Sequence, residues 1–207
     1  MEWGFLPSIV SAAAGLGGVW LGAELTSRRE LRREADQYAK DIAYLAIIVS
    51  AHLQRFVDGC VSVVDDDGTS YGEPAGEGGY YETTVATPIF EPLTLTVNWK
   101  VLPPRLMDEI MSLPYHIESL NRRIAGVGEF DDPPDFSEYF WERRHGYAVL
   151  GLRVSSVADR LRQHARLDIA STTETDWSKP AYLKEKKSEL EVGRKTRPQA
   201  NDWPIAD

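Results

Sequence analysis

The stretch that decides how this chain is organised reads Trp3-Gly-Phe-Leu-Pro-Ser-Ile-Val-Ser-Ala-Ala-Ala-Gly-Leu-Gly-Gly-Val-Trp-Leu-Gly-Ala23, without one charged side chain. A helix of this length, at about 1.5 Å per residue, spans roughly 30 Å, which is the hydrocarbon thickness of a bilayer. Trp3 and Trp20 lie near its ends, where membrane-spanning helices place aromatic side chains. The stretch predicts a single transmembrane helix within an anchor formed by residues 1–25.

Two other interpretations of this stretch stay open. A cleaved signal peptide needs a basic segment before its apolar run, whereas the only charged residue there is Glu2. A buried or interfacial helix of a soluble protein is the second alternative. The prediction of a membrane anchor is preferred because the uncharged run is long enough to cross the bilayer.

The residues after the apolar stretch predict its orientation. Arg28, Arg29, Arg32 and Arg33 follow it closely, and no Lys or Arg precedes it. Because basic residues favour the cytoplasmic side, we expect the N-terminus outside and the rest of the chain in the cytoplasm, at a bacterial inner membrane. The four arginines are either contacts for anionic lipid head groups or determinants of topology alone.

Small residues recur every four positions within the stretch, at Ala14, Gly18 and Gly22. Such a face lets two membrane helices approach closely, so it predicts a possible homo-oligomer. The alternative is the general abundance of glycine in membrane helices. The single Cys60 permits no internal disulfide, which is consistent with a reducing compartment.

Average composition hides this anchor. The 207 residues carry 32 Asp and Glu against 23 Lys and Arg, a net charge of -9, with 43% hydrophobic residues. These values fit a folded domain and exclude collagen-like, disulfide-scaffold and wholly disordered classes. The acidic balance argues against nucleic acid as a partner, since nucleic-acid binding depends on neutralising phosphates.

Three long helices are expected in the region 26–166, and each carries an apolar seam with steps of three and four residues. The first covers residues 27–64, and its apolar run Ile42–Ala51 predicts a core helix rather than a second span. The second opens at Pro103-Pro104 and is broken by Pro114. The third covers about 136–166, with Asp135 as its expected N-cap. The seam of the first helix is Leu31, Ala35, Tyr38, Ile42, Leu45, Val49, His52, Phe56, Gly59 and Val63. The seam of the second is Leu106, Ile110, Leu113, Ile117, Leu120, Ile124 and Val127. The seam of the third is Phe140, Tyr147, Val154 and Leu161.

Between the first two helices lies an acidic insertion at about 65–92, with seven acidic residues, no basic ones and five glycines. We expect an exposed loop there, followed by a short hairpin that pairs 93–99 with 83–87. The third helix is expected to carry a basic surface that includes Arg143 and Arg144. Residues 167–207 predict a polar, largely irregular tail with at most a short helix at 181–192. The fold class is thus mainly α: a membrane helix followed by a cytoplasmic three-helix bundle with long antiparallel helices and an inserted acidic loop and short β segment.

Candidate chemistry is sparse in this sequence. Glu142-x-x-His145 has the spacing of di-iron bundles but lacks the second motif that such sites need. Asp65-Asp66-Asp67-Gly68 resembles the start of a calcium loop, yet the EF-hand register fails at Thr69, so a solubilising loop is favoured over a weak cation site. We therefore assign no catalytic, metal-binding or cofactor-binding residue and expect no cofactor.

The cysteine and the histidines also predict structural roles. Cys60 follows an apolar run without a nearby base, which predicts a buried structural thiol. His52 falls on the predicted seam and is expected in the core. Enzymatic activity is left open but disfavoured, because no nucleophile elbow, phosphate-binding loop or zinc motif occurs.

Two blocks, Phe90-Glu-Pro-Leu-Thr-Leu-Thr-Val-Asn-Trp-Lys-Val-Leu-Pro103 and Asp131-Asp-Pro-Pro-Asp-Phe-Ser-Glu-Tyr-Phe-Trp-Glu-Arg143, carry a resemblance. They resemble blocks in proteobacterial single-span membrane proteins of unknown function, some from prophage regions. The resemblance covers about residues 10–165. It implies a bacterial inner membrane and brings no activity, cofactor or site residue.

The sequence thus favours a membrane-anchored interaction or scaffolding module, with membrane lipid and an unknown protein as partners. Two alternatives remain. One is a membrane-tethered enzyme or metal-dependent effector that uses the acidic residues around 65–67 and 129–135. The other is a phage-encoded membrane modulator of exclusion or lysis, which depends on the resemblance alone.

Overall fold

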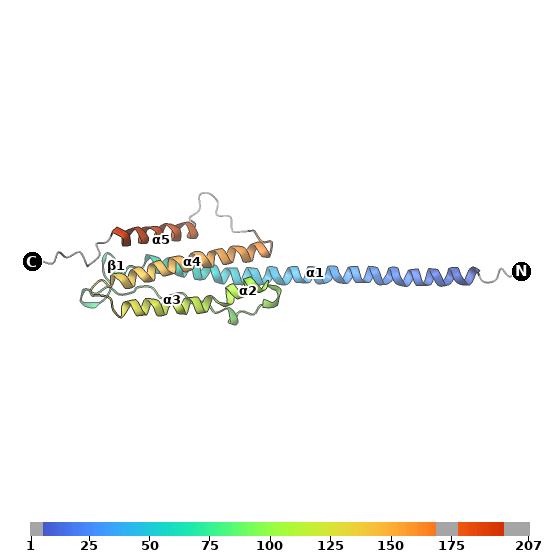
Figure 1. Cartoon of the computed structure of the whole chain (residues 1–207), viewed down its shortest axis with the longest axis horizontal. Coiled ribbons are helices and arrows are strands. Elements are labelled where there is room, and N and C mark those ends of the chain that lie inside the picture. The colour runs from blue at the N-terminus through green and yellow to red at the C-terminus, as the bar shows by residue number, and fades with distance from the viewer. Residues whose placement is uncertain (1–5, 169–177, 197–207) are drawn as a thin grey trace, which may run out of the picture. The chain divides into compact units, whose positions relative to one another are not determined.

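The computed structural model describes residues 6–168 and 178–196, and it describes side-chain surroundings from residue 24 onward. The protein is mainly helical (Figure 1). Its helices are α1 (Leu6–Asp65), α2 (Pro104–Met111), α3 (Leu113–Gly128), α4 (Ser137–His164) and α5 (Lys179–Thr196). The strands β1 (Thr69–Ser70) and β2 (Glu73–Pro74) form a minimal antiparallel pair. Short 3-10 turns occupy Glu77–Gly79, Pro92–Thr94 and Trp99–Val101.

The chain divides into two units, Met1–Ile42 and Ala43–Asp207, and α1 runs unbroken from one into the other. In the first unit, every described side chain from Leu25 to Lys40 is exposed. The predicted span at 3–23 lies outside the residues whose side chains are described, and the same holds for the small face of Ala14, Gly18 and Gly22. The second unit is called the helical unit below.

One stretch with described side chains, Glu24–Asp65, is long and apolar enough to cross a membrane. It lies near the N-terminus, and 44% of its apolar window is buried inside the protein. Core helices of soluble proteins and signal sequences meet the same criterion, so this stretch is weak evidence for a membrane location. Its second half is indeed a core helix, as the short apolar run at 42–51 predicts.

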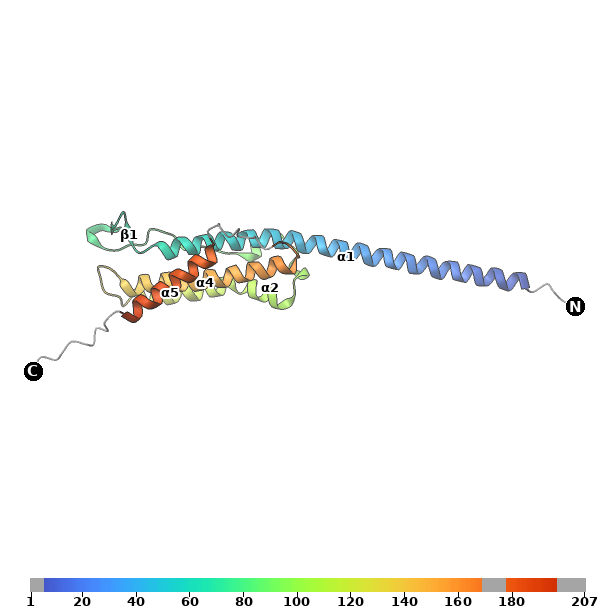
Figure 2. The same ribbon diagram turned by 90° about the horizontal axis from the view of Figure 1, so that it is seen from above.

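The core of the helical unit lies between α1, α3 and α4. Hydrogen bonds define the directions: Arg143 on α4 contacts Asp66 just beyond α1, and Arg162 near the other end of α4 contacts Ser50. Hence α4 runs antiparallel to α1, and Figures 1 and 2 show these helices side by side with α5 packed on α4. The buried apolar side chains of α1 in this unit are Leu45, Ala46, Val49, Leu53, Phe56, Val57, Cys60, Val63 and Val64.

The seams of the second and third predicted helices are confirmed. Pro114 does separate two helices: α2 ends at Met111 and α3 begins at Leu113, because the proline ring clashes with the carbonyl four residues earlier. Of the seam residues predicted for the second helix, all are buried except Val127 at the end of α3, which is partly exposed. All four seam residues of α4 are buried: Phe140, Tyr147, Val154 and Leu161.

The seam predicted for the first helix is partly wrong. His52 is exposed and its neighbour Leu53 is fully buried. A strict seven-residue repeat drifts by about 20° per heptad against a straight helix, so the buried face moves from one position to its neighbour. Leu31 and Tyr38 are also exposed, at 62% and 51%.

Two local predictions fail and one is extended. The predicted hairpin of 83–87 with 93–99 is absent; 92–94 and 99–101 are 3-10 turns, since Pro92 and the Asn98 side chain favour turns over a ladder. Asp135 does not cap α4: the N-cap is Phe136, and the Asp131 carboxylate accepts a hydrogen bond of 2.7 Å from the Tyr139 amide instead. The short helix expected at 181–192 is present as the longer α5.

Candidate functional site

The predicted lipid-contacting arginines are all exposed on α1, outside the helical unit. Arg28 pairs through Nε with the Glu24 carboxylate one turn earlier, at 2.7 Å, and both side chains are largely solvated. The four side chains occupy two successive turns, so they form one basic collar. We use "collar" below for Arg28, Arg29, Arg32 and Arg33.

The three consecutive aspartates at the end of α1 form a junction that the sequence did not predict. Asp66 is buried, and its carboxylate accepts hydrogen bonds from the backbone amides of Gly68, Thr84 and Val85 and from the Thr84 hydroxyl, at 2.9 to 3.3 Å. Burial raises the pKa of Asp66, but the hydrogen bonds from Thr84 and the Arg143 guanidinium outweigh it and hold the pKa below its usual value. Asp66 is thus an ionised structural hub rather than a solubilising residue.

The partner of Asp66 is Arg143, which was expected on the basic surface of the third helix. Its side chain is 2% exposed, and Nη1 lies 2.7 Å from the Asp66 carboxylate. Nη2 donates to the carbonyl of Val85. Because one guanidinium binds both sides of the acidic insertion, it fastens the insertion to α4.

The neighbouring residues connect α1 to α5. Arg144 Nε donates to the Val64 carbonyl at 2.7 Å, which satisfies one of the free acceptors at the end of α1. The Tyr182 hydroxyl of α5 donates to the Asp65 carboxylate. Burial and that carboxylate raise the pKa of Tyr182 to about 12.

Helix α5 is held mainly by polar and aromatic contacts. Its one buried side chain, Leu183, faces Gly151 on α4, where a Cβ would lie 2.8 Å from Leu183 and 3.0 Å from Cys60. Trp141 donates to the Leu190 carbonyl at 3.0 Å and stacks on His145, while Arg194 lies 3.8 Å above the Trp141 ring. Gly151 therefore allows Leu183 of α5 to pack closely against α4.

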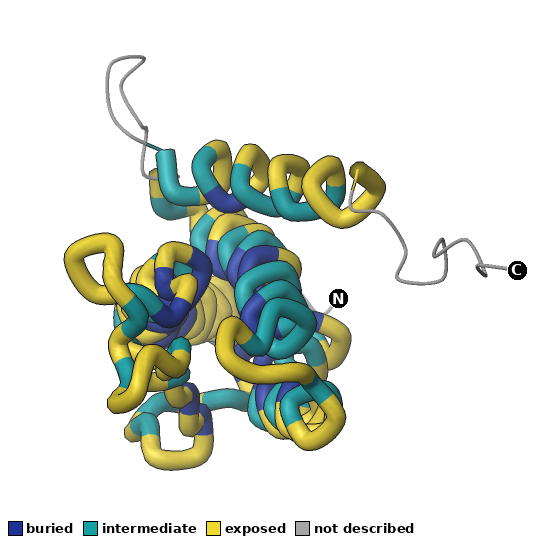
Figure 3. Tube along the Cα trace, turned by 90° about the vertical axis from the view of Figure 1, so that its left-hand side faces the viewer, coloured by how far each residue is buried: buried dark blue, intermediate teal, exposed yellow. Residues whose placement is uncertain are grey.

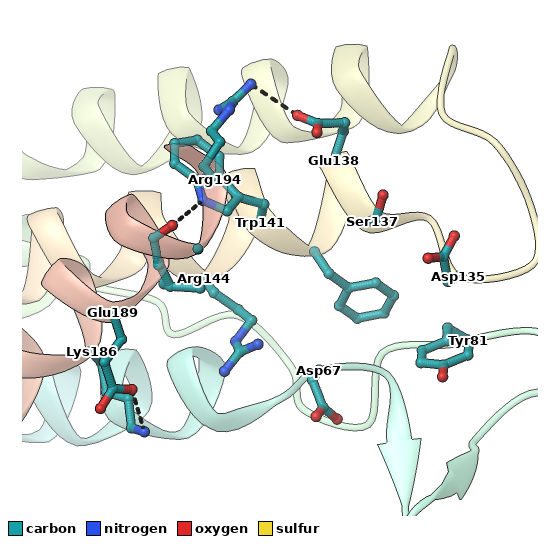
Figure 4. Close-up of a pocket in the computed structure, with 13 residues that line it drawn as sticks. Asp67, Tyr81, Asp135, Ser137, Glu138, Trp141, Arg144, Lys186, Glu189 and Arg194 are labelled. Carbon is teal, nitrogen blue, oxygen red and sulfur yellow. Dashed lines mark hydrogen bonds and ion pairs between the residues drawn. The ribbon is translucent and has the colours of Figure 1, made fainter. Parts of the chain in front are cut away.

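A groove of about 500 Å³ lies between the start of α4, α5 and the acidic insertion (Figure 4). Its α5 wall carries Lys186 paired with Glu189 at 2.8 Å, and Arg194 paired with Glu138 at 2.9 Å. The opposite end holds Asp67, Tyr81 and Asp135, which Figure 4 shows apart from these pairs. The groove can bind a polar or charged group.

The weak metal candidates of the sequence do not assemble. Glu142 pairs with Arg123 at 2.5 Å, and His145 lies 3.1 Å from Glu191, so the two residues of the Glu-x-x-His spacing face different partners. Within residues 6–168 and 178–196, no group of three or more His, Cys, Asp or Glu side chains is placed to hold a metal ion. Cys60 is buried as predicted, and burial raises the pKa of its thiol, which disfavours the reactive thiolate.

Sequence reasoning missed the Asp66–Arg143 pair because the two residues are 77 positions apart. A signal was available: an aspartate triplet ends one helix, and an arginine pair begins another that runs antiparallel to it. The chain matches no protein-family model, and comparisons with curated proteins and with solved structures likewise gave no match.

Proposed function

We propose that this protein is a membrane-anchored interaction module, in which residues 1–25 span a bacterial inner membrane and a cytoplasmic three-helix bundle binds a partner protein. The observation that carries this proposal is α1, a single helix that contains the apolar N-terminal stretch, the exposed collar and a core helix of the helical unit. One element thus joins the anchor to the folded unit.

The collar supports the orientation in this proposal. Its four arginines are exposed immediately after the uncharged stretch, where they favour the cytoplasmic side and can contact anionic head groups. The small face at Ala14, Gly18 and Gly22 remains our proposal for self-association within the membrane.

An enzyme that uses the acidic loops is less well supported. Asp66, the most buried acidic residue of the insertion, is fully occupied by hydrogen bonds within the protein. The two acidic segments are therefore better explained as parts of the fold and of its surface.

A topology experiment tests the anchor and its orientation. A cytoplasm-active reporter and a periplasm-active reporter are each fused after Asp207 of the full chain, and membranes are extracted with high salt and then detergent. We expect only the cytoplasmic reporter to be active and extraction to require detergent. Activity of the periplasmic reporter, or complete release by salt, would contradict the proposal.

Site-specific crosslinking in native membranes tests the interaction. A photoreactive residue replaces, one at a time, the exposed side chains Ile47, Ile89, Phe130 and Val192, with the buried Leu45 as the control position. We expect one reproducible adduct from one face of the helical unit and none from Leu45. Absence of adducts at every exposed position would count against an interaction module.

A further inference from the structure

Figure 3 looks onto the end of the helical unit that carries the acidic insertion, with the chain coloured by burial. Aromatic side chains gather at this end. A pocket of about 320 Å³ lies between the insertion, the last turns of α3 and the first turn of α4, and its aromatic lining is Tyr81, Phe136, Tyr139 and Phe140. Tyr81 and Phe140 also line the 500 Å³ groove, so the two hollows adjoin. We call these four residues with Glu82 the aromatic pocket.

The aromatic pocket is a built feature rather than a chance opening. The Tyr81 amide donates to the Pro134 carbonyl at 2.9 Å, which fixes the insertion against the connection between α3 and α4. Gly128 has no side chain where a Cβ would lie 2.8 Å from the Tyr139 ring. Phe136 adopts a left-handed conformation with φ 45°, rare for an aromatic residue, and its ring stacks on Tyr80.

Carboxylates are the unpaired charges around the pocket, because the basic groups of the adjoining groove, Arg144, Lys186 and Arg194, bind partners within the protein. Glu82 lines it, and the connection from Glu129 to Asp135 adds four carboxylates without a basic residue. In the part of the chain that the structure describes, Glu82, Glu129, Asp132 and Asp135 form no ion pair, unlike Glu138 and Glu189 in the adjoining groove. Their field therefore acts on whatever approaches from solution.

Aromatic rings beside a carboxylate match one side chain best. The arginine guanidinium stacks on aromatic faces and binds carboxylates through paired N–H groups, whereas lysine offers only a point charge. The same negative field disfavours nucleic acid and anionic lipid. Adjoining hollows, rather than a single closed cavity, suit an extended chain better than a small molecule.

We propose that the aromatic pocket binds an extended, arginine-containing segment of a partner protein, with the guanidinium against the aromatic rings and the carboxylates. This inference deepens the proposed function, because it names the partner chemistry of the interaction module. The observation behind it is the aromatic pocket, which is lined by Glu82 and adjoins a groove that carries Asp135.

The test uses the full chain in nonionic detergent and a fluorescent peptide of alternating Arg and Pro. Binding is measured by fluorescence anisotropy at about 0.15 M salt, where the Debye length is about 8 Å. Matched peptides replace Arg by Lys or by Glu. We expect the arginine peptide to bind most tightly, the lysine peptide more weakly, and the glutamate peptide not at all.

Variants locate the binding. Phe136→Ala removes a ring, and Glu82→Gln and Glu129→Gln each remove one exposed charge; each is expected to weaken binding by about two- to fivefold. Val192→Ala and Glu185→Gln change exposed side chains of α5 and are expected to have no effect. Circular dichroism checks folding, and the two glutamine variants keep the test valid if Phe136→Ala unfolds.

Several outcomes would overturn the inference. Equal binding by wild type and all pocket variants would show attraction to the net charge of -9 alone. Equal affinity for the arginine and lysine peptides would remove the role of the rings, and no binding of the arginine peptide would remove the site. If the peptide fails to bind while crosslinks arise from another face, the interaction module stands without this pocket.

Discussion

Helix α1 contains two stretches of similar length with opposite surroundings. From Leu25 to Lys40 every side chain is exposed, although Leu31 and Tyr38 continue an apolar spacing. From Leu45 to Val64 the same spacing, shifted by one position at Leu53, is buried by the rest of the helical unit. Apolar periodicity thus indicates a helix, but it does not tell which turns are covered.

The two arginine-rich segments repeat this contrast. The collar arginines are exposed, whereas Arg143 at the start of α4 is buried on Asp66 and Arg144 caps α1. Both segments contain adjacent arginines, Arg28-Arg29 and Arg32-Arg33 in the collar and Arg143-Arg144 in α4. What differs is the presence of an acidic helix end within reach, and this decides whether an arginine stabilises the fold or stays available to a partner.

The largest expected effect comes from breaking the buried pair. Asp66→Ala leaves the Arg143 charge buried without its carboxylate, which should lower the free energy of unfolding by about 3–5 kcal/mol. Urea denaturation of the full chain in nonionic detergent, followed by near-UV circular dichroism, measures it. Glu109→Ala breaks the exposed pair with Arg160 and should cost less than about 1 kcal/mol. Similar losses in both variants would contradict the contrast.

Acid should weaken the same pair. The pKa of Asp66 in the folded protein lies below its ordinary value of 3.8, so its stabilising contribution is present above pH 3.8 and is lost as pH falls through the lower folded pKa. Asp66→Asn should therefore show a shallower decrease of unfolding free energy below pH 3.8 than the wild type. Parallel curves for both proteins would exclude this role of Asp66.

The next largest effect compares leucines on one helix. Leu53→Ala removes a fully buried side chain and should cost about 2–5 kcal/mol, whereas Leu31→Ala, at 62% exposure, should stay within about 0.5 kcal/mol. His52→Ala should resemble Leu31→Ala, because His52 is exposed. The same urea titration measures all three. A large loss in Leu31→Ala would mean that the exposed stretch is packed in solution, for example against a second copy.

The sequence predicted most of the helical elements for a clear physical reason. Steps of three and four residues identify amphipathic helices locally, and Pro114 marks the break between α2 and α3 within a few residues. The predicted phase at His52 and the predicted N-cap Asp135 were wrong, because both depend on contacts with distant elements rather than on local preference.

The candidate site was less predictable than the fold. Asp66, Thr84 and Arg143 meet only after α1 and α4 have packed antiparallel, so the one available signal, acidic and basic residues at facing helix ends, depends on knowing that packing. The aromatic pocket likewise combines the insertion with the ends of α3 and α4. Local reasoning recognised the acidic character of these segments but not that one carboxylate was structural and others were exposed.

A smaller effect is expected for the collar. Arg32→Gln, in full-length protein reconstituted into vesicles, should reduce the preference for a spin-labelled anionic lipid over a zwitterionic one by about fivefold, or about 1 kcal/mol. Arg55→Gln is the matched control, since Arg55 is also exposed on α1 but lies within the helical unit. An unchanged lipid preference in Arg32→Gln would mean that the collar determines topology alone.

The smallest effect concerns the exposed ion pair between Glu24 and the first arginine of the collar, Arg28. Glu24→Gln removes the partner of Arg28, where the side chains are 44% and 69% exposed. Exposed pairs one turn apart contribute about 0.3–0.5 kcal/mol, so amide hydrogen exchange around residues 24–32 should speed up only about twofold. Glu30→Gln is the control for removing one negative charge from the same stretch. If Glu24→Gln accelerated exchange more than about tenfold, the exposed stretch of α1 would depend on this pair, and the contrast with the buried Asp66–Arg143 pair would disappear.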